Sequence, residues 1–196
     1  MAVSALILDL GNALVKHDNA LLFRRFAERF STTEEALAAQ LDGALRELVN
    51  RGQLPGDALR VELQRRVGVE VSSDEFFALW NCHFTVDAQM VAEVASHVGK
   101  RRLVLLSNTH DLHVRWIRQR VPLLERFDAL VLSCEVGLVK PEPDIYRRAL
   151  AAAAVPAEEA AFFDDVERYV QAAAAVGLRG RVFTTVAQFR ADLATL

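Results

Sequence analysis

The chain has 196 residues, a hydrophobic content of 52% and a formal net charge of −3 at pH 7, which is enough apolar material for a sizeable core. The weak negative charge and a pI near 6.0 exclude the basic surface typical of proteins that bind nucleic acids or anionic membranes. The apolar runs are too short to span a membrane, and residues 1–10 lack the charged start and cleavage site of a signal peptide. We therefore expect a cytoplasmic protein with no nucleic-acid or membrane partner.

Five short apolar runs are predicted to be buried β-strands, because each ends at a polar or turn-forming residue. In chain order they cover residues 5–8, 103–106, 129–132, 160–163 and 182–184. The runs do not alternate with polar residues, so both faces of the sheet should be covered. Amphipathic segments at 111–120, 143–154 and 167–176 indicate helical crossovers between parallel strands.

Residues 17–86 show no strand pattern. Their periodicity predicts four helices over 19–29, 34–49, 56–67 and 74–82, and two capping boxes, Ser31 with Glu34 and Ser72 with Glu75, mark the second and fourth starts. Because the bundle follows the first strand, it emerges at the carboxyl end of that strand and would lie over any site there. We interpret residues 17–86 as a helical cap on a core of residues 1–16 and 87–196; a bundle that only adds hydrophobic core is the alternative.

Asp9 ends the first predicted strand and precedes Gly11 and Asn12, so the chain turns with backbone N–H groups free to face an anion. An ionised carboxylate at this place can attack phosphorus and form an acyl phosphate, which water then hydrolyses. Considered alone, Asp9 is better explained by a turn or a helix cap.

Ser107 and Asn108 follow the second strand, where a hydroxyl and an adjacent N–H either clamp phosphate oxygens or simply cap the next helix. Lys140 lies in the proline-flanked segment GLVKPEP, and its ammonium is a compact charge suited to a phosphate oxygen and to the carboxylate nucleophile. An ordinary surface lysine is the alternative interpretation.

Asp164 and Asp165 close the fourth strand directly after two phenylalanines, and adjacent carboxylates in such surroundings repel each other unless a cation neutralises them. Mg²⁺ prefers carboxylate oxygens, waters and a substrate phosphate, and Asp9 at the neighbouring strand end could complete the set. We therefore predict Mg²⁺ as the cofactor, with a solvated acidic loop as the alternative.

Taken together and in this order, four segments of the chain resemble the motifs of the haloacid dehalogenase-like superfamily of phosphatases. The segments are LILDLGN, VLLSNT, GLVKPEPDIY and AFFDDVERYV. The resemblance covers the whole chain and implies an α/β, Rossmann-like core in which the five predicted strands lie in the order 5-4-1-2-3. It also implies a small phosphorylated metabolite as substrate. The motifs are most similar to those of bacterial sugar-phosphate phosphatases, including enzymes that act on α-glucose 1-phosphate.

The resemblance also implies roles for the residues of this chain that match the motifs. Asp9 would be the nucleophile and Lys140 the catalytic charge clamp. The groups that would bind the phosphate are Gly11, Asn12, Ser107, Asn108 and Lys140. Mg²⁺ would be held by Asp9, the Gly11 carbonyl oxygen and Asp165, with Asp164 beside it.

Two positions depart from the superfamily pattern. Gly11 stands where most members carry an aspartate that acts as general acid and base, a contribution of about 10²–10⁴-fold in rate. Tyr169 stands where the subgroup usually has an asparagine, and its side chain either offers a hydroxyl or crowds the metal. The residues that could supply the missing proton are His17, Asp18, His110 and His113. For each of them, a surface residue or one that only contacts the site is the favoured alternative.

Three functions are consistent with these residues. The leading hypothesis is a Mg²⁺-dependent phosphatase that works through an aspartyl phosphate. A haloacid dehalogenase needs no acid at Gly11, because halide departs without a proton, but it would leave the Asp164 and Asp165 pair without a purpose. A binding protein that lost its chemistry at Gly11 and Tyr169 is the third. The sequence favours no particular oligomeric state.

Overall fold

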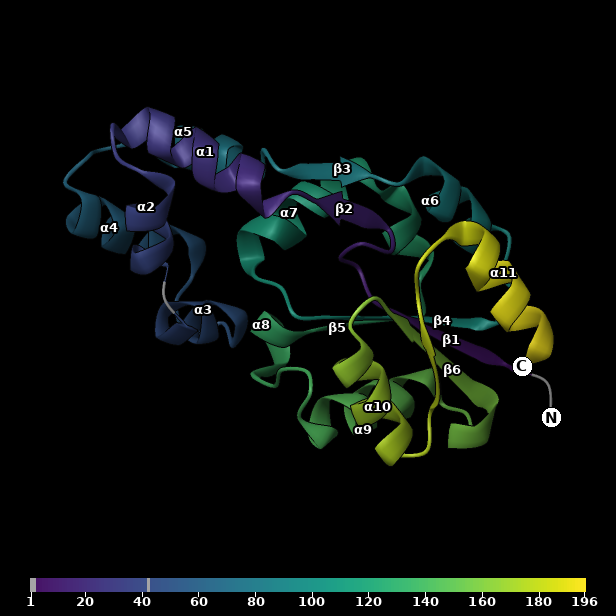
Figure 1. Ribbon diagram of the computed structural model, residues 1–196. Coiled ribbons are helices and arrows are strands. Elements are labelled where there is room, and N and C mark those ends of the chain that lie inside the picture. The colour runs from purple at the N-terminus through teal and green to yellow at the C-terminus, as the bar shows by residue number, and fades with distance from the viewer. Residues whose placement is uncertain (1–2, 42) are drawn as a thin grey trace.

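The computed structural model describes residues 3–41 and 43–196. A five-stranded parallel sheet forms its centre, with the order β5-β4-β1-β6-β7 (Figure 1). The strands are β1 (Ala5–Leu8), β4 (Arg102–Ser107), β5 (Ala129–Leu132), β6 (Ala160–Asp164) and β7 (Arg179–Val182). Followed along the chain, this is the predicted strand order, so the α/β class and the topology are confirmed. Among the described residues, no helix is long and apolar enough to cross a membrane.

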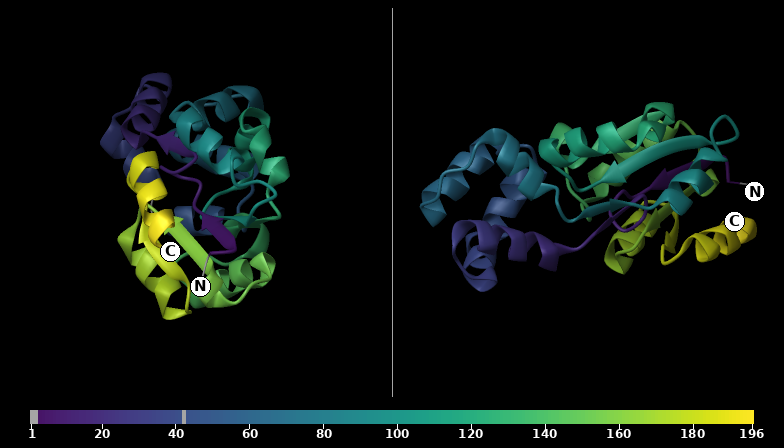
Figure 2. Two further views of the ribbon diagram at one scale, coloured as in Figure 1. Left: turned by 90° about the vertical axis from the view of Figure 1, so that its right-hand side faces the viewer. Right: turned by 90° about the horizontal axis from the view of Figure 1, so that it is seen from above.

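Helices cover both faces of the sheet (Figures 1 and 2). Leu6 and Leu8 of β1 belong to the hydrophobic cluster on one face, whereas Ala5 and Ile7 belong to the cluster on the other. The first cluster is completed by α6 (Ala88–Ala95), α7 (Asp111–Arg120) and α11 (Val186–Thr195), and the second by α9 (Pro143–Ala153) and α10 (Glu167–Ala175). Burial on both faces explains why these strands are continuous apolar runs.

The last strand lies earlier in the chain than predicted, at Arg179–Val182 instead of 182–184. It is an edge strand whose residues are partly exposed, so it does not need the apolar run that the prediction relied on. Phe183 leaves the strand and packs into the core. Gly180 allows α10 to approach closely, since a Cβ there would lie 2.7 Å from Val170 Cγ1.

Five helices form an insert between β1 and β4. They are α1 (Asn19–Phe30), α2 (Glu34–Gln40), α3 (Gly43–Asn50), α4 (Gly56–Val67) and α5 (Ser73–Trp80), and together they are called the helical insert below. The insert lies beyond the carboxyl ends of the parallel strands (Figures 1 and 2). It has its own hydrophobic cluster, in which the Phe26 ring packs edge-on against Phe76 and Trp80 at centroid distances of 5.9 and 5.8 Å.

The prediction of four helices was wrong, because the segment 34–49 is divided between α2 and α3. Gly43 has a low helix propensity and begins α3, and the hydrophobic period continues across the break; residue 42 lies outside the described residues.

The Ser31 capping box is also wrong, since Thr33 Oγ1 accepts from Ala36 N at 3.2 Å and Ser31 ends α1 at a φ of 50°. The Ser72 cap is confirmed by its bond from Glu75 N, 3.2 Å long.

Two short strands at the ends of the insert were not predicted. The strands β2 (Val15–His17) and β3 (Phe84–Val86) pair antiparallel, so the chain enters and leaves the insert side by side. Each has three residues, too few for a period-2 pattern to be recognised in the sequence. The remaining elements are the short helix α8 (Ser133–Val136) and the 3₁₀ turns η1 (Pro122–Arg126) and η2 (Ala157–Glu159).

The helical insert contacts the rest of the molecule through a small set of polar and close contacts. Arg51 forms an ion pair with Glu142 and donates to the Gly137 carbonyl at 2.9 Å. Gly52, at a φ of +70°, approaches so closely that a Cβ there would lie 2.0 Å from the Cys134 carbonyl oxygen. These contacts hold α3 against α8, which places the insert over the carboxyl edge of the sheet.

Candidate active site

A buried lysine joins two carboxylates at the carboxyl edge of the sheet. Asp9 follows β1 and Asp164 ends β6, so these neighbouring strands bring the two side chains together. Lys140 Nζ lies 2.7 Å from Asp9 Oδ1 and 2.5 Å from Asp164 Oδ2. Asp9, Lys140 and Asp164 are 7%, 4% and 0% exposed, which excludes the surface-lysine interpretation. Buried charges of this kind persist only when they are paired, and here one ammonium serves two carboxylates.

Burial and this shared charge determine the protonation of the group. Burial raises the pKa of Asp9 to about 6; the Lys140 ammonium lowers it and the Asp164 carboxylate raises it. Burial alone would lower the pKa of Lys140, but the two carboxylates outweigh burial and raise it. The lysine is therefore charged at neutral pH. A further cation beside Asp9 would stabilise its ionised form and lower its pKa.

The arrangement of carboxylates fits such a cation. Among the described residues, Asp9, Asp164 and Asp165 form the group whose ligand atoms all lie within 4.8 Å of one another and could hold a metal ion. Asp165 is oriented by Asn12, whose Nδ2 donates to Asp165 Oδ2 at 2.8 Å. Asp164 Oδ1 accepts from Val166 N at 2.8 Å. A set made only of oxygen donors suits a hard ion such as Mg²⁺ better than a softer transition metal.

Two polar residues at the carboxyl end of β4, Ser107 and Asn108, have different roles in the structure. Ser107 is 3% exposed and lines the cavity at the end of β4, next to β1. The Asn108 side chain makes two bonds to the backbone of Lys140, from Nδ2 to the carbonyl at 3.0 Å and from the Lys140 N–H to Oδ1 at 2.8 Å. Asn108 therefore fixes the loop that carries the lysine, a role that the sequence did not suggest.

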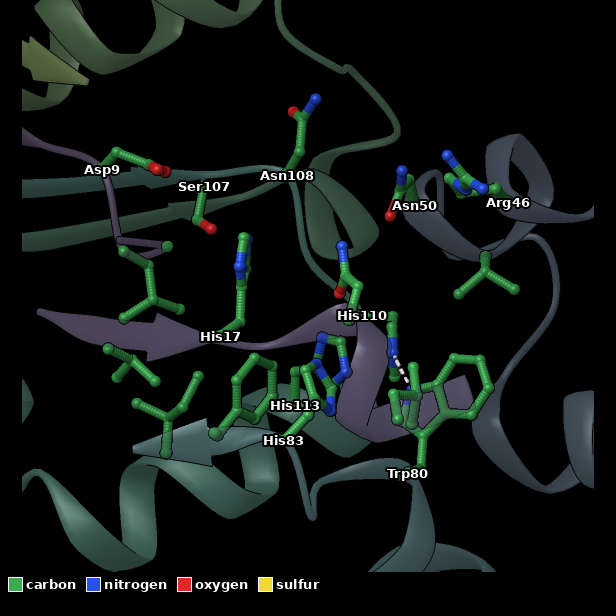
Figure 3. A pocket seen from close by; sticks show the side chains of 18 of the residues that line it. Asp9, His17, Arg46, Asn50, Trp80, His83, Ser107, Asn108, His110 and His113 are labelled. Atoms are coloured by element: carbon green, nitrogen blue, oxygen red, sulfur yellow. Dashed lines mark hydrogen bonds between the residues drawn. The ribbon is translucent and has the colours of Figure 1, made fainter. Parts of the chain in front are cut away.

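A cavity of about 410 Å³ opens from this charged edge towards the helical insert (Figure 3). Asp9, Gly11, Ser107, Lys140 and Asp165 line its sheet end. Its other walls include apolar side chains of the insert together with Arg46 and Asn50 of α3. The volume is sufficient for a small metabolite, with the charged groups at one end.

Comparison with known proteins supports the resemblance seen in the motifs. The family model of haloacid dehalogenase-like hydrolases matches residues 5–177. The chain belongs to this family.

Proteins similar to this chain include a solved structure of the family and two phosphatases. The enzyme BT-2542 of Bacteroides thetaiotaomicron, crystallised with magnesium and inorganic phosphate, is 25% identical and superposes with a TM-score of 0.84 over 94% of this chain and 96% of that chain. The D-ribitol-5-phosphate phosphatase of the same organism is 23% identical over 171 residues, 83% of each protein. Phosphatase MT3486 of Mycobacterium tuberculosis is 29% identical over 104 residues, 53% of this chain and 48% of that protein. The matches to this phosphatase and to two longer curated proteins span half or less of their length.

Tyr169, the second departure from the family pattern, covers the lysine. Its ring centroid lies 5.1 Å from Lys140 Nζ, and its hydroxyl accepts from Arg168 Nη2 at 3.2 Å. The phenol therefore stacks over the ammonium as a cation–π partner. Tyr169 also lines the cavity, so it forms part of the wall beside the charged edge.

Four histidines line the cavity, and three of them form a group around Trp80. Trp80 Nε1 donates to His110 Nε2, and the ring centroids of His110 and His113 lie 3.7 Å apart. Burial lowers the pKa of His83 to about 4 and also lowers the pKa of His110 and His113, so all three are neutral near pH 7. The fourth, His17, lies closest to the sheet end in Figure 3.

Several residues of this cavity carry no functional signal in the sequence. His83, Arg46 and Asn50 were not candidates, because they come from the insert and reach the cavity only through its packing on the sheet. Asp18, which was a candidate, instead caps α1 by accepting from Leu21 N at 3.1 Å. An aspartate directly before a predicted helix start favours an N-cap, and Asp18 precedes the helix predicted at 19–29.

Proposed function

We propose that the protein is a Mg²⁺-dependent phosphatase that hydrolyses a small phosphorylated metabolite through an aspartyl phosphate at Asp9. One observation carries the proposal: the carboxylates of Asp9, Asp164 and Asp165 converge at the charged end of a cavity of about 410 Å³, where the Lys140 ammonium pairs with the first two. A metal-dependent attack on phosphorus requires this combination of a nucleophilic carboxylate, oxygen ligands and a fixed positive charge.

Each part of the site has a role in the proposed reaction. Asp9 and Asp165, with the Gly11 carbonyl oxygen and Asp164 beside them, would hold Mg²⁺, whose positive charge would favour binding of the phosphate and ionisation of Asp9. Asp9 then attacks phosphorus and forms the acyl phosphate. Lys140 neutralises charge on the phosphate oxygens and holds the Asp9 carboxylate at 2.7 Å.

The phosphate itself would be bound by polar groups at the strand ends. Ser107 donates its hydroxyl to a phosphate oxygen, and the backbone N–H groups of Gly11 and Asn108 supply further donors. Asn12, which the sequence placed among the phosphate-binding residues, does not offer its backbone N–H, because that group donates to the Val15 carbonyl at 2.7 Å. Because the Asn108 side chain also makes two hydrogen bonds to the Lys140 backbone, it holds the loop that carries the charge clamp beside the phosphate donors.

We propose a sugar phosphate or polyol phosphate as the substrate class. The similarity to a ribitol-phosphate phosphatase over 83% of both proteins supports this choice, as does a cavity that extends from the charged edge past neutral histidines to Arg46 and Asn50. In this proposal residues 17–86 act as a cap that closes over the substrate, and residues 1–16 and 87–196 form the catalytic core.

Release of inorganic phosphate from a panel of sugar phosphates, polyol phosphates, nucleotides and p-nitrophenyl phosphate tests the proposal. We expect turnover with Mg²⁺, loss of turnover with excess chelator, and loss with Asp9→Asn. Asp165→Asn should raise the Mg²⁺ concentration needed for half-maximal activity, since it removes one charged ligand. No Mg²⁺-dependent turnover on any substrate would contradict the proposal.

The same experiments separate the other two functions. A dehalogenase would release halide from 2-haloacids in the presence of excess chelator. A binding protein would take up phosphate or a phosphate analogue with no turnover. Neither behaviour is expected, because a dehalogenase would leave the Asp164 and Asp165 pair without a purpose and a binding protein would leave Asp9 without a role as nucleophile.

A further inference from the structure

Gly11 leaves space beside the nucleophile where the family aspartate would stand. A Cβ at Gly11 would lie 3.6 Å from Asp9 Oδ2 and 3.8 Å from His17 Nε2, both ordinary contact distances. The His17 imidazole therefore reaches the region into which a side chain at position 11 would extend. A ring nitrogen at this place can transfer a proton to the same leaving-group oxygen that the missing carboxyl group would have protonated.

The position of His17 is set by the two short strands and by Asn12. His17 pairs with Phe84 in the β2–β3 ladder, and its backbone N–H donates to Asn12 Oδ1 at 3.4 Å. The same asparagine donates from Nδ2 to Asp165 Oδ2 at 2.8 Å, so one side chain links the backbone of His17 to a carboxylate of the proposed metal site. Figure 3 shows the ring rising from β2 towards Ser107, at the sheet end of the cavity.

The other three candidates for the proton donor are engaged elsewhere. His110 Nε2 accepts from Trp80 Nε1, and burial lowers the pKa of both His110 and His113, so these rings carry no charge near pH 7. Asp18 caps α1. Among the described residues, no side chain forms a hydrogen bond with the His17 ring, which leaves both nitrogens free to act on a substrate.

We propose that His17 is the catalytic residue that protonates the leaving group in place of the absent aspartate at position 11. The proposal rests on the phosphatase function proposed above. In the first step Asp9 forms a bond to phosphorus, the bond from phosphorus to the leaving oxygen breaks, and the proton on His17 passes to that oxygen to give the alcohol. In the second step the neutral imidazole takes a proton from the water that attacks phosphorus, the bond to Asp9 breaks, and phosphate leaves. His17 ends protonated, as it began.

The leaving group provides the test, because p-nitrophenolate departs as a stable anion and an alkoxide does not. We compare kcat/KM for p-nitrophenyl phosphate with kcat/KM for the best alkyl phosphate of the panel. His17→Gln is expected to lower the alkyl value by about 10²-fold, the lower end for general acid catalysis, and the aryl value by less than about 3-fold. Lys16→Gln, on the same strand with its side chain paired to Asp87, is the matched control and should change neither value.

Addition of Gly11→Asp to His17→Gln places a carboxyl group in the space beside residue 17. This double variant should recover at least about 10-fold of the lost alkyl activity. An equal loss on both substrates in His17→Gln, no loss on either, or no recovery in the double variant would each overturn the role of His17. Absence of turnover in the unaltered protein would instead overturn the phosphatase function, so the two failures are distinguishable.

Discussion

The two ends of the cavity are built on different principles. At the sheet end, Asp9, Lys140 and Asp164 are buried and paired with one another. At the insert end, the lining apart from Arg46 is apolar or neutral, and the buried atoms His83 Nδ1 and His113 Nε2 have no hydrogen-bond partner among the described residues. Because fixed partners hold each charge of the sheet end in one position, this end is suited to a single type of reaction. Neutral rings with unmet hydrogen-bonding capacity are suited to selecting the leaving group in the proposed function.

Removal of the shared cation at the sheet end should have the largest effect. Lys140→Met leaves two buried carboxylates without compensation, and we expect a loss of about 3–5 kcal/mol in the free energy of unfolding, measured by urea denaturation. Lys16→Met removes a lysine whose side chain is 66% exposed and should cost less than about 1 kcal/mol. Equal effects of the two substitutions would show that the charges of the sheet end do not depend on one another.

The second prediction tests how the insert end is held over the sheet end. Gly52→Ala combines an unfavourable φ of +70° with a Cβ 2.0 Å from the Cys134 carbonyl oxygen, so α3 must move away from α8. We expect a loss of roughly 2–3 kcal/mol and faster hydrogen exchange in both helices. Gly68→Ala has a φ of +72° and no atom within 4 Å of the new Cβ, so it should cost about 1 kcal/mol with unchanged exchange. If both variants behave alike, the close contact does not position the insert.

A smaller effect is expected from the polar group of the insert end. Trp80→Phe keeps an aromatic ring against Phe26 and Phe76 but removes the donor to His110. The expected loss is about 1–2 kcal/mol in urea denaturation, with kcat/KM for p-nitrophenyl phosphate changed by less than about 3-fold. Trp116→Phe, another buried tryptophan, is the control for lost packing. A loss of activity as large as that of Asp9→Asn would show that the two ends are not separate in function.

The smallest effect at neutral pH concerns His83. Its pKa falls from 6.5 to about 4 on folding, chiefly because it is buried. Below pH 6.5 the unfolded chain takes up a proton that the folded chain does not, so stability declines as the pH falls towards 4, by up to about 1.4 kcal/mol per pH unit. His83→Gln should flatten this decline when unfolding is measured between pH 7 and pH 5. Parallel curves for the two proteins would contradict a neutral, buried His83.

The sheet end was largely predictable from the sequence, and the insert end was not. Asp9, Ser107 and Asp164 stand at the ends of apolar runs, and the carboxyl ends of parallel strands meet at one edge, so strand prediction alone brings them together. The hydrogen bonds from Asn108 to the Lys140 backbone had no such signal, since a loop conformation determines them.

The insert end depends on contacts between distant parts of the chain. Arg51 and Glu142 are 91 residues apart, and their ion pair helps to place α3 and its cavity-lining residues over the sheet. No period of apolar residues encodes such a contact. The β2–β3 pair, which orients His17, was missed for a related reason: its strands are three residues long, and their pairing is specified by the two connections of the insert and not by local sequence.

The formation of a phosphoryl group on Asp9 is the central claim, and chemical trapping tests it most directly. Protein is quenched during turnover with Mg²⁺ and its substrate, treated with borohydride, which reduces an acyl phosphate to the alcohol, and digested for mass spectrometry. The account predicts homoserine at position 9, and none without substrate or in Asp9→Asn. Steady release of phosphate with an unmodified Asp9, or with homoserine at another aspartate, would contradict it.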